Sequence, residues 1–191
     1  MMREARMINV RRREISGDGW QLELREAEQL VSILSIRSGA EVADLLAGQG
    51  CFSLALSARV GRAGIVHALD LSTDIVRFAE NGVIPEQIRP TRWIDNHLPI
   101  PDGCLDYAVG AFCLGELDHP VASLTDLRRA LRPGASVAIF EWRQRTAIGI
   151  HLPATSSPAA CELMLDEAGF ETGSGQAVSD KVYLVLGRRR L

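Results

Sequence analysis

The sequence predicts an α/β fold, a three-layer domain built on a mostly parallel sheet with an antiparallel strand at the C-terminus. Two observations support this. Apolar periodicity switches repeatedly between helix-like and strand-like spacing along the 191 residues, which is typical of alternating strands and helices. The segment 42–50, VADLLAGQG, runs from apolar residues through an acid to Gly48 and Gly50. That order predicts a buried strand turning sharply into a helix.

The remaining elements follow in chain order, each bounded by capping or turn residues. Ser157 and Pro158 open the last helix, and Gly169 closes it. The segments GFETG and KVYLVLGRR are joined by a short link, which predicts an antiparallel pair of strands. The predicted helices are 24–36, 52–60, 72–81, 120–131 and 158–168. The predicted strands before the final pair are 42–46, 64–70, 91–95, 104–114 and 136–142, and Arg132-Pro133-Gly134 is predicted as a turn.

Composition limits the class of protein. Apolar residues make up 47% of the chain and the formal charge is −3, so the chain is globular and has no field that attracts nucleic acid. No apolar run approaches the roughly 18 residues that span a bilayer, and no signal-like segment follows the N-terminus, so we expect a cytoplasmic protein without a membrane partner. Four scattered cysteines predict no metal site. Residues 1–23 are expected to be an extension and 24–191 the domain.

Two acids mark the expected binding edge. Asp44 lies near the end of the first strand, and Asp70 closes the second strand 20 residues after Gly50. An acid at that distance from a glycine turn holds the ribose diol in dinucleotide-binding folds. The sequence therefore predicts a pocket for adenosine.

From about residue 24 the whole chain resembles the class I S-adenosylmethionine-dependent methyltransferase family. The resemblance rests on ordered segments: VADLLAGQG, VHALDLS, WIDNHLPIPDGCLDYAV, LTDLRRALRPGASVAIFEW, and LDEAGFETG with KVYLVLGRR. It implies a Rossmann-like domain with a seven-stranded sheet, and S-adenosylmethionine as cofactor. One departure is Leu46, which stands where the family's first motif usually has glycine. Because strand side chains alternate, we expect Leu46 to follow Asp44 toward the helix layer and point into the core.

The resemblance also implies a role for each residue at the edge. The turn of Ala47, Gly48 and Gly50 would face the methionine carboxylate, beside a helix N-terminus that favours an anion. Asp44 would hold the ammonium group and Asp70 both ribose hydroxyls. The other implied contacts are Asp95 to the adenine amine, the Asn96 amide to the ring, and Leu71 and Phe112 as walls.

The acceptor is expected to be a small molecule. The segment AFCLGEL lacks the Asn/Asp-Pro-Pro-aromatic loop that resembling nucleic-acid amino-methyltransferases use. Because the methyl donor is already activated, positioning can supply much of the catalysis and a base is optional. No catalytic residue is assigned; the candidates are Glu116, Asp118, His119, Glu141 and His151, although residues at such positions more often lie in a solvated helix entry or loop or cap a strand. The acceptor, the methylated atom and the oligomeric state stay open.

Two alternative functions remain. An NAD-dependent oxidoreductase would share Gly48-x-Gly50-x-x-Ser53 and Asp70, but no catalytic lysine is available near the fourth or fifth predicted strand. A non-catalytic protein that binds S-adenosylmethionine or a nucleotide on the same fold is favoured by Leu46. Fold alone does not decide between catalysis and binding.

Overall fold

A computed structural model describes residues 13–14, 20–21, 24–71, 84–94, 97–143 and 157–191. The described helices are α1 (Leu24–Ser32), α2 (Cys51–Val60), the 3-10 helix η1 (Leu114–Glu116), α4 (Pro120–Ala130) and α5 (Pro158–Glu167). The strands are β1 (Arg13–Glu14), β2 (Trp20–Gln21), β3 (Glu41–Leu45), β4 (Ile65–Asp70), β5 (Ile88–Arg92), β6 (Leu105–Ala111), β7 (Leu131–Trp142), β8 (Phe170–Thr172), β9 (Gln176–Ala177) and β10 (Val182–Arg189).

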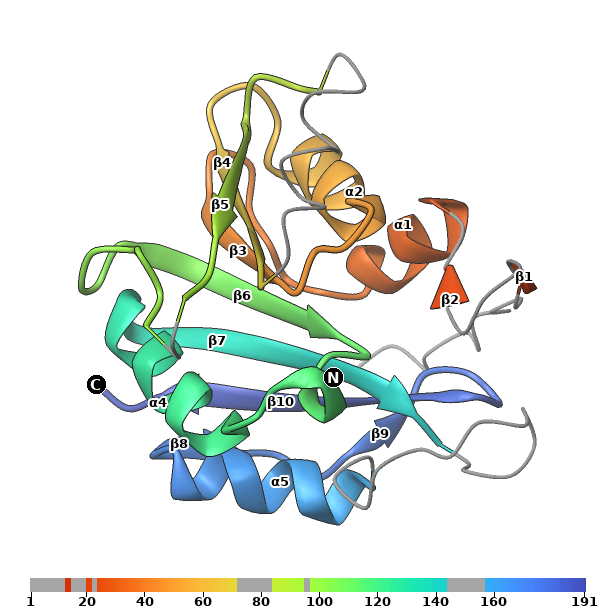
Figure 1. Ribbon diagram of the computed structural model, residues 1–191, viewed down its shortest axis with the longest axis vertical. Helices are drawn as coiled ribbons and strands as arrows, with labels where there is room; N and C mark the ends of the chain where they lie inside the picture. Colours follow the sequence, from red (N-terminus) through yellow and green to blue (C-terminus); the bar gives the residue numbers. More distant parts are fainter. Residues whose placement is uncertain (1–12, 15–19, 22–23, 72–83, 95–96, 144–156) are drawn as a thin grey trace.

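The main sheet confirms the predicted topology. Its order is β5-β4-β3-β6-β7-β10-β8, with β9 pairing with β10 as a short eighth strand. Strands β5, β4, β3, β6 and β7 are parallel, whereas β10 pairs antiparallel with both β7 and β8. The C-terminal strand therefore lies one place in from the sheet edge (Figure 1). The carboxyl ends of β3, β4 and β6 meet at one edge of the sheet, where open α/β folds bind ligands.

Helices cover both faces of the sheet, which gives the predicted three layers (Figure 1). On one face, α1 and α2 pack on Val42, Val66, Val109 and Phe140. We call this core the α2-side core. On the other face, α4 and α5 pack with Leu45, Ile139 and further residues of the strands. We call this second core the α4-side core.

Some predicted boundaries are wrong. Helix α1 ends at Ser32, not at residue 36. Strand β5 ends at Arg92, three residues before Asp95. Arg132-Pro133-Gly134 does not interrupt β7: the pairing shifts from Leu105–Leu131 to Tyr107–Ser136, so the extra residues are absorbed as an irregularity within the strand. The predicted helix 72–81 and residues 1–12 of the predicted extension lie outside the described residues.

Candidate functional site

The turn between β3 and α2 follows β3, which carries Asp44, and contacts the end of β4, which carries Asp70. Gly48 and Gly50 have φ angles of 51° and 81°, in the left-handed region that glycine adopts without a Cβ penalty. The Ala47 amide donates to the Leu69 carbonyl at 2.8 Å. The Gly48 amide donates to Oδ2 of Asp70 at 2.7 Å. Asp70 therefore lies directly against the glycine turn, as the predicted adenosine pocket requires.

Asp44 lies deeper than Asp70. It is 1% exposed, and its Oδ2 accepts a hydrogen bond from the Ser53 hydroxyl, on α2, at 2.6 Å. Burial raises the pKa of Asp44 to about 7, with a further contribution from the negative charge of Asp70, although the hydrogen bonds from Ser53 act in the opposite direction. A positive charge close to such a carboxyl would favour its ionised form. Ser53 is thus a site residue that sequence reasoning treated only as a small residue.

Asp70 and Leu71 mark the end of β4. Asp70 is 8% exposed, and Leu71 is 40% exposed. The Asp70 carbonyl accepts the Trp93 amide at 2.7 Å, which ties the end of β4 to the segment after β5. Ile94, in that segment, is 52% exposed, and sequence reasoning did not select it. Leu71 and Ile94 thus leave apolar surface free near the ends of two paired strands, whereas Asp95 and Asn96 lie outside the described residues.

Two residues at this edge adopt a left-handed backbone although neither is glycine: Leu46 with φ 54° and Phe112 with φ 57°. Leu46 is half-buried and packs against the α4-side core. The expected core orientation is therefore supported, but the expected face is wrong. Strict alternation from Val42 and Asp44 leads to the α2-side core, and the positive φ turns the side chain to the opposite face.

Phe112 forms the wall beyond β6. Its ring stacks on Trp142, with centroids 4.3 Å apart and an interplanar angle of 21°. Its amide donates to the Phe140 carbonyl at 2.8 Å. Phe112 is half-buried and Trp142 is 5% exposed. The ends of β6 and β7 therefore carry two stacked aromatic rings, whereas the ends of β3 and β4 carry acids. Trp142 was missed as a site residue, although an aromatic at the end of SVAIFEW was the available signal.

The catalytic candidates differ in their surroundings. Glu141 is 3% exposed, and its Oε1 accepts the Leu114 amide at 3.1 Å. It holds the turn into η1, and burial raises its pKa to about 7. The exposed candidates are Glu116, Asp118 and His119. His119 precedes α4 without a side-chain capping bond, and His151 lies outside the described residues.

Glu116, at the end of η1, lies within reach of the charge of Asp70 at the end of β4. Desolvation raises its pKa, and the negative charge of Asp70 raises it further.

Among the described residues, no group of three or more His, Cys, Asp or Glu side chains could hold a metal ion. Nor is any of the described helices long and apolar enough to cross a membrane.

These features fit S-adenosylmethionine. The glycine turn leaves room for a ligand, since a Cβ on Gly48 would meet no heavy atom closer than 4.0 Å. Gly50 caps α2 without a side-chain hydrogen bond, so the helix N-terminus is available to a carboxylate. Asp70 and the buried Asp44 supply the acids that a ribose diol and an ammonium group require.

Comparisons with known proteins agree with this geometry. Residues 23–155 match the profile of the ubiE/COQ5 methyltransferase family. A demethylmenaquinone methyltransferase of Lactiplantibacillus plantarum is 30% identical over 121 residues, which are 61% of this chain and 51% of the relative. A ubiquinone/menaquinone biosynthesis C-methyltransferase UbiE of Paraburkholderia phymatum is 31% identical over 110 residues, 56% of this chain and 45% of the relative. The chain thus spans about half the length of these curated relatives.

Among solved structures, a SAM dependent methyltransferase from Aquifex aeolicus superposes with a TM-score of 0.76 at 26% identity, covering 85% of this chain and 88% of the other. Similarity over almost the whole of both chains supports the methyltransferase fold, and the family match argues against the NAD-dependent alternative. The chain therefore belongs to the ubiE/COQ5 methyltransferase family, and its cofactor is S-adenosylmethionine.

Proposed function

We propose that this chain transfers a methyl group from S-adenosylmethionine to a ring carbon of a small quinol-type acceptor. The observation that carries the proposal is the hydrogen bond between the Gly48 amide and Asp70, which places a strand-end carboxylate against a glycine turn in a methyltransferase fold. The names of the relatives, which include demethylmenaquinone methyltransferase and ubiquinone/menaquinone biosynthesis C-methyltransferase, support the acceptor class.

In the proposed donor site, Asp70 accepts both ribose hydroxyls through its carboxylate. The turn of Ala47, Gly48 and Gly50 lies along the methionine carboxylate, and Asp44 attracts the ammonium group. Leu71 packs on the adenine face, while Asp95 and Asn96 are proposed to bind the ring edge. When bound, the cofactor supplies an electrophilic methyl group on a positively charged sulfur.

The proposed acceptor site lies beside Phe112, at the ends of β6 and β7. The half-buried ring of Phe112 offers an apolar face of the kind that aromatic ligands contact in offset stacks. Carbon methylation of a hydroxylated ring breaks the sulfur–methyl bond, forms a carbon–carbon bond and releases the ring proton. A base near the acceptor is therefore useful.

Glu116 is the candidate that suits this step best, because it is exposed and its pKa is raised by desolvation and by the charge of Asp70. A raised pKa makes a carboxylate a better proton acceptor near neutral pH. His119 is the second candidate. Glu141 is less suited, since its buried carboxylate already accepts the Leu114 amide, and we propose that it only holds η1 in place.

The test is turnover with methyl-labelled S-adenosylmethionine and a short-chain demethylmenaquinol. We expect label in the quinol product, with Glu116→Gln slowing turnover by about 100-fold while affinity for S-adenosylhomocysteine is unchanged. Tight S-adenosylhomocysteine binding without turnover on any small hydroxylated ring would instead support the non-catalytic alternative. Failure to bind S-adenosylhomocysteine would overturn the whole proposal. A cytoplasmic location and the absence of a nucleic-acid partner stay predictions from the sequence.

A further inference from the structure

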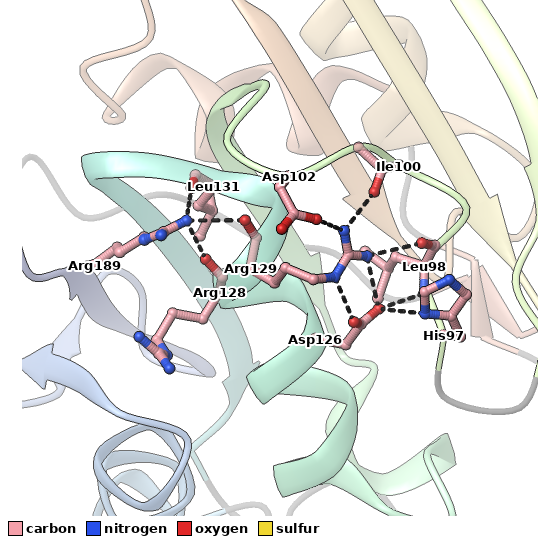
Figure 2. A network of polar contacts seen from close by, with 9 residues as sticks. All are labelled: His97, Leu98, Ile100, Asp102, Asp126, Arg128, Arg129, Leu131 and Arg189. Atoms are coloured by element: carbon pink, nitrogen blue, oxygen red, sulfur yellow. Dashed lines mark hydrogen bonds and ion pairs between the residues drawn. The ribbon is translucent and has the colours of Figure 1, made fainter.

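Arg129, in the last turn of α4, engages the loop 97–102 with both terminal nitrogens of its guanidinium (Figure 2). Its Nη1 donates to the Ile100 carbonyl at 2.9 Å and to Asp102 at 2.5 Å. Its Nη2 donates to the Leu98 carbonyl at 3.1 Å. One side chain therefore satisfies two backbone carbonyls of a segment that belongs to no helix or strand. A planar fork of donors suits this use, which a lysine cannot reproduce.

Asp126 completes the contact from one helical turn earlier. Its Oδ1 accepts from Nε of Arg129 at 2.8 Å, and its Oδ2 accepts the Leu98 amide at 2.6 Å. His97 Nδ1 lies 3.5 Å from the same Oδ2. We call Asp126 and Arg129 the loop clamp. Although burial alone would raise it, the pKa of Asp126 lies below its ordinary value because of its bonds to Arg129 and Leu98, so the clamp is charged at neutral pH.

The clamped loop begins at the donor site. The His97 amide donates to the Ile94 carbonyl at 3.0 Å, and the two residues form an isolated antiparallel bridge. Trp93, immediately before, donates its amide to the carbonyl of Asp70. The clamp therefore acts on the segment that carries the exposed Ile94, which follows β5, the strand paired with β4. This is the adenine end of the proposed site.

Leu98 and Ile100, with Trp93, are buried in the α4-side core. Two kinds of contact thus hold the loop: its apolar side chains pack in the α4-side core, and its backbone is bonded to the loop clamp. Packing alone fixes depth, whereas the directional bonds to Leu98 and Ile100 fix the position of the backbone along the edge.

We propose that Asp126 and Arg129 are positioning residues for adenine recognition: by fixing the loop 97–102 they set the place of Ile94 and His97, in the segment that Trp93 ties to the end of β4. This inference rests on the proposed function, because it assumes that the donor's adenine lies at this edge. It predicts that loosening the clamp weakens adenine discrimination more than it weakens binding of the rest of the donor.

Arg189, at the end of β10, offers a matched control because it contacts the same helix. Its Nη1 donates to the carbonyls of Arg128 and Arg129, each at 2.9 Å, and to that of Leu131 (Figure 2). It supports the C-terminal end of α4, and within the described part of the chain it makes no hydrogen bond or ion pair with the loop 97–102. Variants at Arg189 therefore perturb α4 without releasing the loop.

The experiment compares wild type, Arg129→Lys, Asp126→Asn and Arg189→Lys by calorimetric titration with S-adenosylhomocysteine and with S-inosylhomocysteine, in which an oxo group replaces the adenine amine. We expect both clamp variants to lose about tenfold in S-adenosylhomocysteine affinity. In these variants, the ratio of the affinity for S-adenosylhomocysteine to the affinity for the inosine analogue should fall toward one. Arg189→Lys should stay within about twofold of wild type for both ligands.

Hydrogen exchange shows whether a variant is loosened or unfolded. In the clamp variants, peptides covering 97–102 should exchange faster while those of β3, β6 and β7 keep their protection. Unchanged discrimination in a clamp variant with a faster-exchanging loop would overturn the inference, as would an equal loss in Arg189→Lys. Both of these outcomes leave the proposed function standing, whereas absence of S-adenosylhomocysteine binding to wild type overturns the proposed function and the inference with it.

Discussion

Leu46 and Phe112 lie just beyond two neighbouring strands, β3 and β6, and share the same left-handed backbone, yet their side chains go to opposite cores. Alternation would send Leu46 to the α2-side core, but it packs against the α4-side core. Phe112 follows Ala108 and Gly110 in alternation, toward the α4-side core, but it packs against the α2-side core and stacks on Trp142.

The comparison shows how this edge is divided. A left-handed residue costs about 1 to 2 kcal/mol without glycine, so each position needs compensating contacts. At Leu46 the positive φ places a bulky side chain against the α4-side core. Asp44 and Ser53 lie on the other face of the sheet, with α2. At Phe112 the reversal places an aromatic ring on Trp142, on the acceptor side. Strain of this kind is concentrated at binding sites.

The largest expected effect is at Phe112. Phe112→Ala should lower the free energy of unfolding by about 2 to 4 kcal/mol, because it removes the stack on Trp142 and keeps a Cβ in the left-handed region. The free energy of unfolding of Phe112→Gly should be about 0.5 to 1 kcal/mol higher than that of Phe112→Ala, since glycine relieves the backbone strain. Urea denaturation measures both.

Phe52 provides the control for this order, because it packs near Phe140 with ring centroids 6.0 Å apart but lies in helix α2. At Phe52 the glycine variant should be less stable than the alanine variant by about 1 kcal/mol, because glycine is unfavourable in a helix. The same order at Phe52 and Phe112 would contradict a left-handed backbone at Phe112.

The next effect is on donor binding. Asp70→Ala should weaken affinity for S-adenosylmethionine by about 1.5 to 3 kcal/mol, roughly 10- to 150-fold, through loss of two charge-assisted hydrogen bonds and of the acceptor for Gly48. Calorimetric titration measures the change. Asp118→Ala, which removes an exposed acid from a nearby loop, should leave affinity unchanged; an equal loss there would show that overall charge, and not the contact of Asp70, determines binding.

A smaller effect concerns pH. Since burial raises the pKa of Asp44 to about 7, from an ordinary 3.8, the folded state holds a proton that the unfolded state releases, so stability falls as pH rises from about 4 to about 7. Glu141, with a pKa of about 7, acts in the same direction. Between pH 6 and pH 8 each group should lower the free energy of unfolding by about 1 kcal/mol.

Asp44→Asn should remove about half of that fall, and the double variant with Glu141→Gln should remove most of it. Urea denaturation at the two pH values measures the difference. The groups that act on Asp44 are Ser53 and Asp70, and Cys51 lies within reach of its charge. A fall in Asp44→Asn as large as in wild type would show that Asp44 is already charged in the folded protein.

The smallest expected effect is the difference in stability between two variants of Leu46. Both Leu46→Ala and Leu46→Gly lose packing against the α4-side core, but only glycine relieves the left-handed backbone. Leu46→Gly should therefore be more stable than Leu46→Ala by about 0.5 to 1 kcal/mol. Thermal melts with S-adenosylhomocysteine should show equal ligand-induced shifts for both, and a larger shift in the glycine variant would indicate that Leu46 intrudes on the donor site.

The sequence predicted the order of elements and the acidic strand ends because both depend on local patterns. Apolar periodicity locates β3 and β4, and the spacing of Gly50 and Asp70 follows from one βαβ unit. The faces of Leu46 and Phe112 could not be predicted, because alternation holds only while the backbone stays extended. A single positive φ at the strand end reverses it.

Other features depended on contacts between distant residues. Glu141 was proposed as a catalytic candidate, but its carboxylate accepts the amide of Leu114, 27 residues away. Arg129 reaches the Leu98 carbonyl across 31 residues. A sequence pattern contains no signal for such pairs, because an arginine in the last turn of a helix is already favoured by the helix dipole.

The most direct test of the account is a crystal structure of this chain with S-adenosylhomocysteine. The account predicts that both carboxylate oxygens of Asp70 lie within hydrogen-bond distance of the ribose hydroxyls. It also predicts that Leu46 and Phe112 keep positive φ angles, with their side chains in opposite cores. A ligand bound away from Asp70, or extended backbone at Leu46 and Phe112, would contradict it.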